Sequence, residues 1–146
     1  MLILLLDDDD FTLIPMKTYL SPLGFEVMTG KTPEAGQRLI DRYSFDCVVA
    51  DQGMGDLTDS RRDRFTVAQM VEFCRAYSPE TRIIIASGQD FMAPEIRRAG
   101  ANLFLMKPVN LDVLTFELKK GRLTKEESEN PEFRFYPNHP ESGDHF

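Results

Sequence analysis

The stretch Phe45–Gly55, FDCVVADQGMG, decides the fold. Its apolar run Cys47–Ala50 has no alternation, which is typical of a strand buried on both faces of a parallel sheet. The run ends at Asp51, and Gly53 marks an irregular loop behind it. A carboxylate that follows a buried strand lies at the edge where open α/β sheets bind their ligands. The stretch therefore predicts a parallel sheet with a functional aspartate at its carboxyl edge.

Three other apolar runs also end in polar side chains. They are Leu2–Leu6 before Asp7, Asp8, Asp9 and Asp10, Ile83–Ala86 before Ser87, and Leu103–Met106 before Lys107–Pro108. The carboxyl ends of parallel strands meet at one edge of a sheet, so we expect Asp7, Asp8, the hydroxyl of Ser87 and the amine of Lys107 to lie near Asp51. Asp9 and Asp10 are more typical of a solvated helix start.

Helical patterns separate the apolar runs. We expect helices over about Asp10–Leu20, after Thr32, from Asp63 or Arg64, over Pro94–Ala99 and after Asn110. The expected strands are Leu2–Leu6, Phe25–Thr29, Cys47–Ala50, Arg82–Ala86 and Leu103–Met106. This alternation predicts an α/β fold, a three-layer (βα)5 doubly wound parallel sheet of the flavodoxin-like kind with strand order 2-1-3-4-5.

At 146 residues with 42% hydrophobic side chains, the chain has the size of one domain and can bury a core. We assign residues 1–120 to this domain and 121–146 to a C-terminal tail without a domain of its own. The charges and prolines of the tail favour flexibility, and only Phe133–Tyr136 resembles a strand. These aromatics could anchor the tail in a groove or in a homodimer.

The net charge of −7 argues against nucleic-acid binding, which needs a basic face. No segment has the apolar length of a membrane span or the pattern of a signal peptide. Cys47 and Cys74 fall in expected buried elements, which favours reduced thiols. We therefore expect a soluble, cytoplasmic protein. His139 and His145 both lie in the tail, which disfavours a Ser-His or Cys-His mechanism.

The expected strand-end groups suggest a chemistry. Asp7, Asp8 and Asp51 would crowd negative charge into one crevice, which is costly without a cation. Oxygen ligands of this kind suit Mg²⁺, which also takes phosphate oxygens as ligands. Lys107 and Ser87 would supply a charge and a donor for phosphoryl oxygens. Together these groups predict phosphoryl transfer to an aspartate.

Four motifs in this order resemble the receiver domains of two-component response regulators. They are LLLDD at Asp7–Asp8, VVADQGM around Asp51, IIIASG at Ser87 and LMKP at Lys107–Pro108. The resemblance extends from Leu2 to about Lys120. Any one motif is weak, but the ordered set, with each motif after a strand, is specific.

The resemblance implies a role for each matching position. Asp51 would be the phospho-acceptor, Asp7 and Asp8 the metal-binding acids, and Gly53 the donor of a main-chain carbonyl to Mg²⁺. Ser87 and Lys107 would hold the phosphoryl group, and Lys107–Pro108 would be a cis peptide. Phe104, three residues before Lys107, would be an aromatic switch that becomes more buried on phosphorylation.

The resemblance also implies partners. A sensor histidine kinase or a histidine phosphotransfer protein would supply the phosphoryl group from a phosphohistidine. Ser87 and Lys107 end the fourth and fifth expected strands, so we expect a downstream protein to bind the face formed by the fourth helix, the fifth strand and the fifth helix. Self-phosphorylation and self-dephosphorylation are the only catalysis expected, with no binding to nucleic acid or membrane.

The sequence departs from the family in one loop. Gly55 stands where the family usually has proline, and the glycine expected a few residues later is absent from Asp56–Arg64. These departures concern the shape of the loop and the partner face.

Two alternatives stay open. Asp8–Leu13, DDDFTL, has the DxDxTL form of haloacid dehalogenase-type phosphatases, which would make Asp8 the nucleophile and leave Asp51 idle. Those enzymes need a further acidic strand end after the lysine, and the only nearby acid, Asp112, falls in an expected helix. The other alternative is a receiver-like interaction module that acts without phosphorylation.

Overall fold

The computed structural model describes residues 1–54, 65–89 and 93–137, and its strands form one parallel sheet in the order β2-β1-β3-β4-β5-β6. The strands are β1 (Leu2–Leu6), β2 (Glu26–Gly30), β3 (Cys47–Asp51), β4 (Arg82–Ser87), β5 (Leu103–Met106) and β6 (Arg134–Tyr136). The predicted order 2-1-3-4-5 is confirmed. The second strand begins one residue later than predicted, and β6 adds a sixth strand beside β5.

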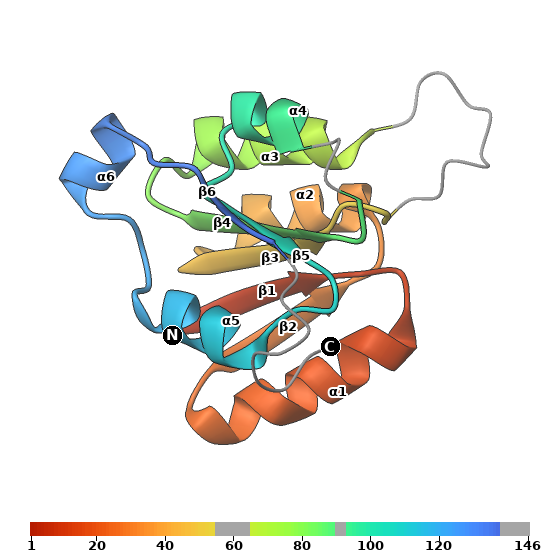
Figure 1. Cartoon of the computed structure of the whole chain (residues 1–146). Helices are drawn as coiled ribbons and strands as arrows, with labels where there is room; N and C mark the ends of the chain where they lie inside the picture. The colour runs from red at the N-terminus through yellow and green to blue at the C-terminus, as the bar shows by residue number, and fades with distance from the viewer. Residues whose placement is uncertain (55–64, 90–92, 138–146) are drawn as a thin grey trace.

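Helices cover both faces of this sheet, with α2, α3 and α4 on one side and α1 and α5 on the other (Figure 1). They are α1 (Asp10–Leu20), the 3-10 helix η1 (Ser21–Leu23), α2 (Pro33–Arg42), α3 (Val67–Tyr77), α4 (Ala93–Ala99), α5 (Leu111–Lys119) and α6 (Lys125–Glu129). The chain therefore has the predicted doubly wound, flavodoxin-like architecture with three layers.

The all-apolar strands are explained by burial on both sides. Alternate side chains of a strand point to opposite faces, so Leu4 and Val48 join the core under α2, α3 and α4. Their neighbours Ile3 and Val49 join the core under α1 and α5. Two cores that share one sheet hold the carboxyl ends of the strands in fixed register.

Short polar side chains fix the helix starts. Asp9, not Asp10, caps α1 and accepts the amide hydrogen of Phe11 at 2.9 Å. Helix α3 begins at Val67, later than predicted, because Thr66 and Gln69 form a capping box there.

The prediction of a flexible tail is wrong for two stretches after Gly121. Helix α6 begins with a capping box between Thr124 and Glu127, and β6 pairs in parallel with β5. Arg82, a buried side chain of β4, donates to the carbonyl of Gly121 at 2.8 Å and reaches Glu127 at 3.4 Å. The start of the tail is therefore tied to the sheet.

Both cysteines are buried and unpaired, as expected. Within the described ranges, none of the helices has the length and apolar character required to cross a bilayer.

Candidate functional site

The carboxyl edge of the sheet brings the predicted strand-end residues together. Asp7 directly follows β1, and Asp51 is the last residue of β3. Ser87 is the last residue of β4, and Lys107 directly follows β5. Asp51 lies in register with Ala86, so Ser87 extends one residue beyond Asp51 on the neighbouring strand.

Three carboxylates form an acidic cluster at this edge. Each of Asp7, Asp8 and Asp51 offers an oxygen, and these oxygens all lie within 4.8 Å of one another. Asp7 is buried, Asp51 is half-buried and Asp8 is exposed. The predicted convergence of Asp8 and Asp51 on one side of the sheet is therefore seen in the structure.

Main-chain amides orient two of these carboxylates. The amide of Asp9 donates to Asp7 Oδ1 at 2.9 Å, and the amide of Gly53 donates to Asp51 Oδ1 at 3.2 Å. Gly53 thus lies in the tight turn directly behind Asp51. The contribution of its main-chain carbonyl to a bound Mg²⁺ stays a prediction.

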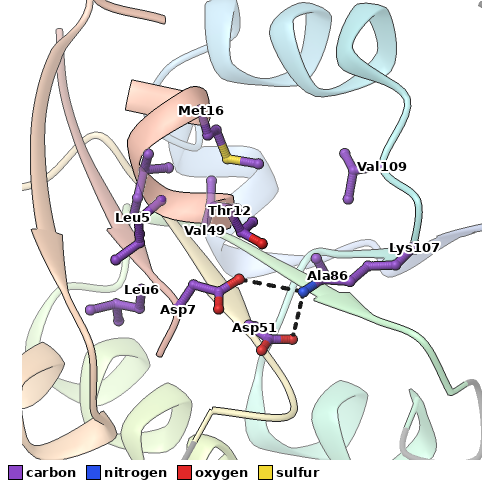
Figure 2. Close-up of a pocket in the computed structure, with 11 residues that line it drawn as sticks. Leu5, Leu6, Asp7, Thr12, Met16, Val49, Asp51, Ala86, Lys107 and Val109 are labelled. Carbon is purple, nitrogen blue, oxygen red and sulfur yellow. Dashed lines mark hydrogen bonds and ion pairs between the residues drawn. The ribbon is translucent and has the colours of Figure 1, made fainter. Parts of the chain in front are cut away.

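Lys107 lies between two of the acids. Its ammonium is 3.2 Å from Asp51 Oδ1 and 3.4 Å from Asp7 Oδ2, and Figure 2 shows it reaching between both carboxylates. Burial alone would lower the pKa of Lys107, but the charges of Asp51 and Asp7 outweigh it and raise that pKa above its usual range. The lysine therefore stays charged in the crevice.

At Asp7, in contrast to Lys107, the surroundings disfavour the charged form. Burial raises the pKa of its carboxyl, and the charge of Asp51 adds to this rise. The hydrogen bond from the Asp9 amide and the charge of Lys107 oppose the rise but do not cancel it. The crevice thus holds more negative charge than one lysine balances, so it favours a further cation.

Ser87 and Lys107 are linked through the main chain. The amide of Lys107 donates to the carbonyl of Ser87 at 2.8 Å, and Ser87 Oγ accepts from the amide of Gln89 at 3.1 Å. The Lys107–Pro108 peptide is cis, as the resemblance implied.

An apolar pocket of about 60 Å³ opens beside the acids (Figure 2). The sequence interpretation missed two of its lining residues on α1, Thr12 and Met16. The signal was present, because Thr12 and Met16 are four residues apart in the expected helix and so share one of its faces. Val109, after the cis proline, closes the pocket from the other side.

Phe104 is fully buried, on the side of the sheet that α4 covers. Its ring stacks on Phe135 of β6, with the ring centroids 5.5 Å apart. The expectation that Phe104 becomes more buried on phosphorylation is therefore wrong for this chain, because no exposed area is left to lose. Its proposed switch role needs a movement that includes Phe135.

Some sequence predictions lie outside the described residues. These are the departure at Gly55, the Asp56–Arg64 stretch, and His139 and His145.

The described groups are suited to a particular class of chemistry. Clustered carboxylate oxygens favour a hard divalent cation, and an unprotonated carboxylate is a competent nucleophile toward phosphorus. An ammonium and a hydroxyl at neighbouring strand ends can bind phosphoryl oxygens. The edge of the sheet therefore suits metal-assisted phosphoryl transfer.

Comparisons with known proteins agree with this arrangement. A family model described as the response regulator receiver domain matches residues 3–119. The chain is also similar to a solved CheY-like receiver domain protein of Methanospirillum hungatei JF-1, at 25% identity and a TM-score of 0.72, covering 88% of this chain and 96% of that one.

Two further solved structures have the same fold. One is a receiver domain of Clostridium thermocellum, 25% identical, with a TM-score of 0.69 and coverage of 82% of this chain and 91% of that one. The other is the response regulator TrrA of Thermotoga maritima, 21% identical, with a TM-score of 0.68 and coverage of 82% and 96%. That protein was solved in complex with Mg²⁺ and BeF.

Proposed function

The chain belongs to the response regulator receiver domain family, and on that premise we propose that Asp51 accepts a phosphoryl group with Mg²⁺ as cofactor. The observation that carries this proposal is the contact of Asp51 with Lys107 inside the cluster of Asp7 and Asp8. The role is that of a signalling domain, with self-phosphorylation and self-dephosphorylation as its only catalysis.

Asp7, Asp8 and Asp51 would hold Mg²⁺, together with the main-chain carbonyl of Gly53. The fit rests on carboxylate oxygens within 4.8 Å of one another and on the raised pKa of Asp7, whose buried charge the Asp9 amide and Lys107 compensate only in part. Bound Mg²⁺ would screen the charge of the acids and bind phosphoryl oxygens.

The chain's own residues would carry out the transfer. An Asp51 oxygen forms a bond to phosphorus while the bond from phosphorus to the donor's nitrogen breaks, and the donor histidine leaves with that electron pair. Lys107, now 3.2 Å from Asp51, turns its charge to a phosphoryl oxygen. Ser87 donates its hydroxyl to another such oxygen.

The donor would be a phosphohistidine on a sensor histidine kinase or a phosphotransfer protein. The two unpaired, buried cysteines support a reducing, cytoplasmic location.

The phosphatase alternative is disfavoured by the position of Asp51. If Asp51 had no role in the chemistry, its contact with Lys107 would have no function. The Lys107 ammonium nevertheless contacts the carboxylates of both Asp51 and Asp7. Asp112, the only acid near the lysine in sequence, lies in the first turn of α5.

Labelling with a small phosphodonor such as acetyl phosphate, with Mg²⁺ present, tests the proposal. Asp51→Asn should abolish labelling, because it keeps the shape and removes the nucleophile. Asp8→Asn should slow labelling and raise the Mg²⁺ concentration required. Asp41→Asn, on α2, is the control and should label as the wild type does. Loss of labelling in Asp8→Asn with retention in Asp51→Asn would establish the phosphatase alternative, and an unlabelled wild type would favour the interaction module.

We propose that the output face consists of α4, β5 and α5. Ser87 and Lys107 would touch the phosphoryl group, and each begins the connection into one side of that face. Phe104 lies between them on β5 as the proposed switch residue. Amide exchange with and without Mg²⁺ and beryllofluoride should show changes in residues 93–106. Changes confined to α1 and α2 would contradict this assignment.

A further inference from the structure

Three consecutive residues near the C-terminal end each contact a different element of one face. The pairs are Phe133 with Arg97 of α4, Arg134 with Glu117 of α5, and Phe135 with Phe104 of β5. The chain's own C-terminal segment therefore lies on the α4–β5–α5 face, and it touches all three of the elements that form it.

The segment contacts both sides of the sheet because side chains alternate along a strand. Phe133 and Phe135 turn toward α4, where Phe133 packs on the core under α2–α4. Arg134 and Tyr136 turn toward α5, where Tyr136 packs on the opposite core. Arg97 Cζ lies 5.8 Å from the centroid of the Phe133 ring, within the range of a cation–π contact.

Glu117 makes the face selective for a cation. Its carboxylate is fully buried, and it contacts Arg134 at 2.5 Å and Lys120 at 3.1 Å. A buried carboxylate that loses a charged partner is strongly destabilising. Lys120 comes from the end of the same helix, whereas Arg134 is supplied by the C-terminal segment. The face therefore receives one of the two cations that pair with Glu117 from outside its own elements.

The main chain of β6 covers an edge of the sheet. Phe135 lies in register with Phe104, and the amide of Arg134 donates to the carbonyl of Asn102 at 3.0 Å. Without β6, β5 would be an edge strand with unpaired groups that can accept another strand. β6 itself is only three residues long and partly exposed. Short, partly exposed strands are among the first elements to open.

We propose that the α4–β5–α5 face is a strand-binding site whose internal occupant is Phe133–Tyr136. Its external partner is a protein segment of the same chemistry, which adds as a strand parallel to β5. That partner presents a cation to Glu117 and an aromatic side chain on each side of it. The internal strand masks the site, and the partner binds when β6 detaches.

This inference shares with the proposed function only the choice of face. Nothing in it requires a phosphoryl group on Asp51. A failure of phosphorylation would leave strand binding unaffected, and a failure of strand binding would leave the labelling of Asp51 unaffected.

A fluorescent peptide of residues 130–137, NPEFRFYP, is the probe. In the unaltered 146-residue chain the attached strand competes at high effective concentration, so the free peptide should bind weakly. Arg134→Ala weakens the attached strand but leaves Glu117 in place. The 146-residue chain with this substitution should therefore bind the peptide at least about ten-fold more tightly than the wild type does.

Two controls distinguish this effect from a general loss of structure. Arg98→Ala removes an exposed arginine of α4 and should bind the peptide as the wild type does. A peptide with alanine in place of its arginine should not bind the Arg134→Ala chain. Equal binding by the wild type and Arg134→Ala, or equal binding of both peptides, would overturn the proposal.

Phe135→Ala serves as a second opened variant if Arg134→Ala fails to fold, and it should bind the unaltered peptide in the same way.

Amide exchange in the unaltered wild type needs no variant. The Arg134 amide should exchange by local opening, faster than the amides within β5. If the Arg134 amide and the β5 amides exchange hydrogen only through global unfolding, β6 does not detach. A wild-type dimer formed by exchange of β6 between two copies would also overturn the internal docking.

Discussion

Lys107 shows how single residues set the balance of charge in the site. Its ammonium contacts Asp7 and Asp51, so it partly neutralises the cluster that would bind Mg²⁺. Lys107→Gln removes this positive charge. Mg²⁺ should then bind more tightly, by about 1 kcal/mol or five-fold in Kd for a partly exposed pair. Isothermal titration calorimetry would measure the change.

The control for this prediction is Lys119→Gln, which removes the same charge from the exposed end of α5. Its Mg²⁺ affinity should stay close to that of the wild type. An unchanged or weaker affinity in Lys107→Gln would mean that the bound cation does not lie near Asp7 and Asp51.

The two cysteines should not react with thiol reagents in the native protein. Burial raises the pKa of Cys47 to about 12 and that of Cys74 to about 11. Because only the thiolate reacts, a disulfide reagent at pH 8 should modify both thiols in denaturant and neither in native buffer. Fast modification of either thiol in native buffer would contradict the burial.

The same shifts predict a pH dependence of stability. The unfolded thiols titrate near pH 9, whereas the folded thiols hold their protons to about pH 12 and 11. Their contribution to the free energy of unfolding is therefore complete below pH 9 and is lost as the pH rises toward these values.

At the scale of elements, the end of α4 depends on one glycine. Gly100 has φ = +112°, and an added Cβ would lie 3.0 Å from Cγ of Arg75. Arg75 also donates to the Gly100 carbonyl at 2.9 Å and to Asn102 Oδ1 at 2.7 Å, which ties α3 to the start of β5. Gly100→Ala would thus strain the backbone and displace Arg75.

Gly24→Ala is a matched control, because Gly24 has φ = +98° but no atom within 4 Å of an added Cβ. Backbone strain alone should cost Gly24→Ala about 1–2 kcal/mol. Gly100→Ala should lose more, because the hydrogen bonds of Arg75 weaken too. Urea unfolding of both variants measures the difference, and equal losses would show that Arg75 adjusts freely.

Strands β1–β5 and helices α1–α5 were predictable to within a few residues because their signals are local. Buried parallel strands such as Cys47–Asp51 are continuous apolar runs, and their polar ends fix the position of Asp51 and Lys107 without long-range information. The β6 strand is different. It is three residues long, and the groups that it contacts, β5 and Glu117, are not its neighbours in sequence. The composition of this segment predicts flexibility, but its contacts with β5 and Glu117 make it a strand.

Helix α6 was missed although a local signal existed. Thr124 and Glu127 have the spacing of a capping box, and the structure uses both hydrogen bonds of that motif. The charges and prolines around this motif predict a flexible segment, and that prediction hid the helix start.

At the scale of the whole molecule, two regions divide the functional roles. The acidic cluster lies at the carboxyl edge of the central strands β1 and β3. The proposed output face lies at the β5 side, where β6 now covers it (Figure 1). Ser87 and Lys107 lie between the two regions, joined by the hydrogen bond from the Lys107 amide to the Ser87 carbonyl. A phosphoryl group that these two residues bind could therefore change the stability of the output face.

Mapping the phosphorylated residue of the wild type tests the central claim most directly. The chain would be incubated with acetyl phosphate and Mg²⁺, digested, and its peptides identified by mass spectrometry. One phosphoryl group should be found, on the peptide that contains Asp51, and chelation of Mg²⁺ should prevent its appearance. A phosphoryl group on Asp8, or a wild type that gains none while Mg²⁺ is present, would contradict the account.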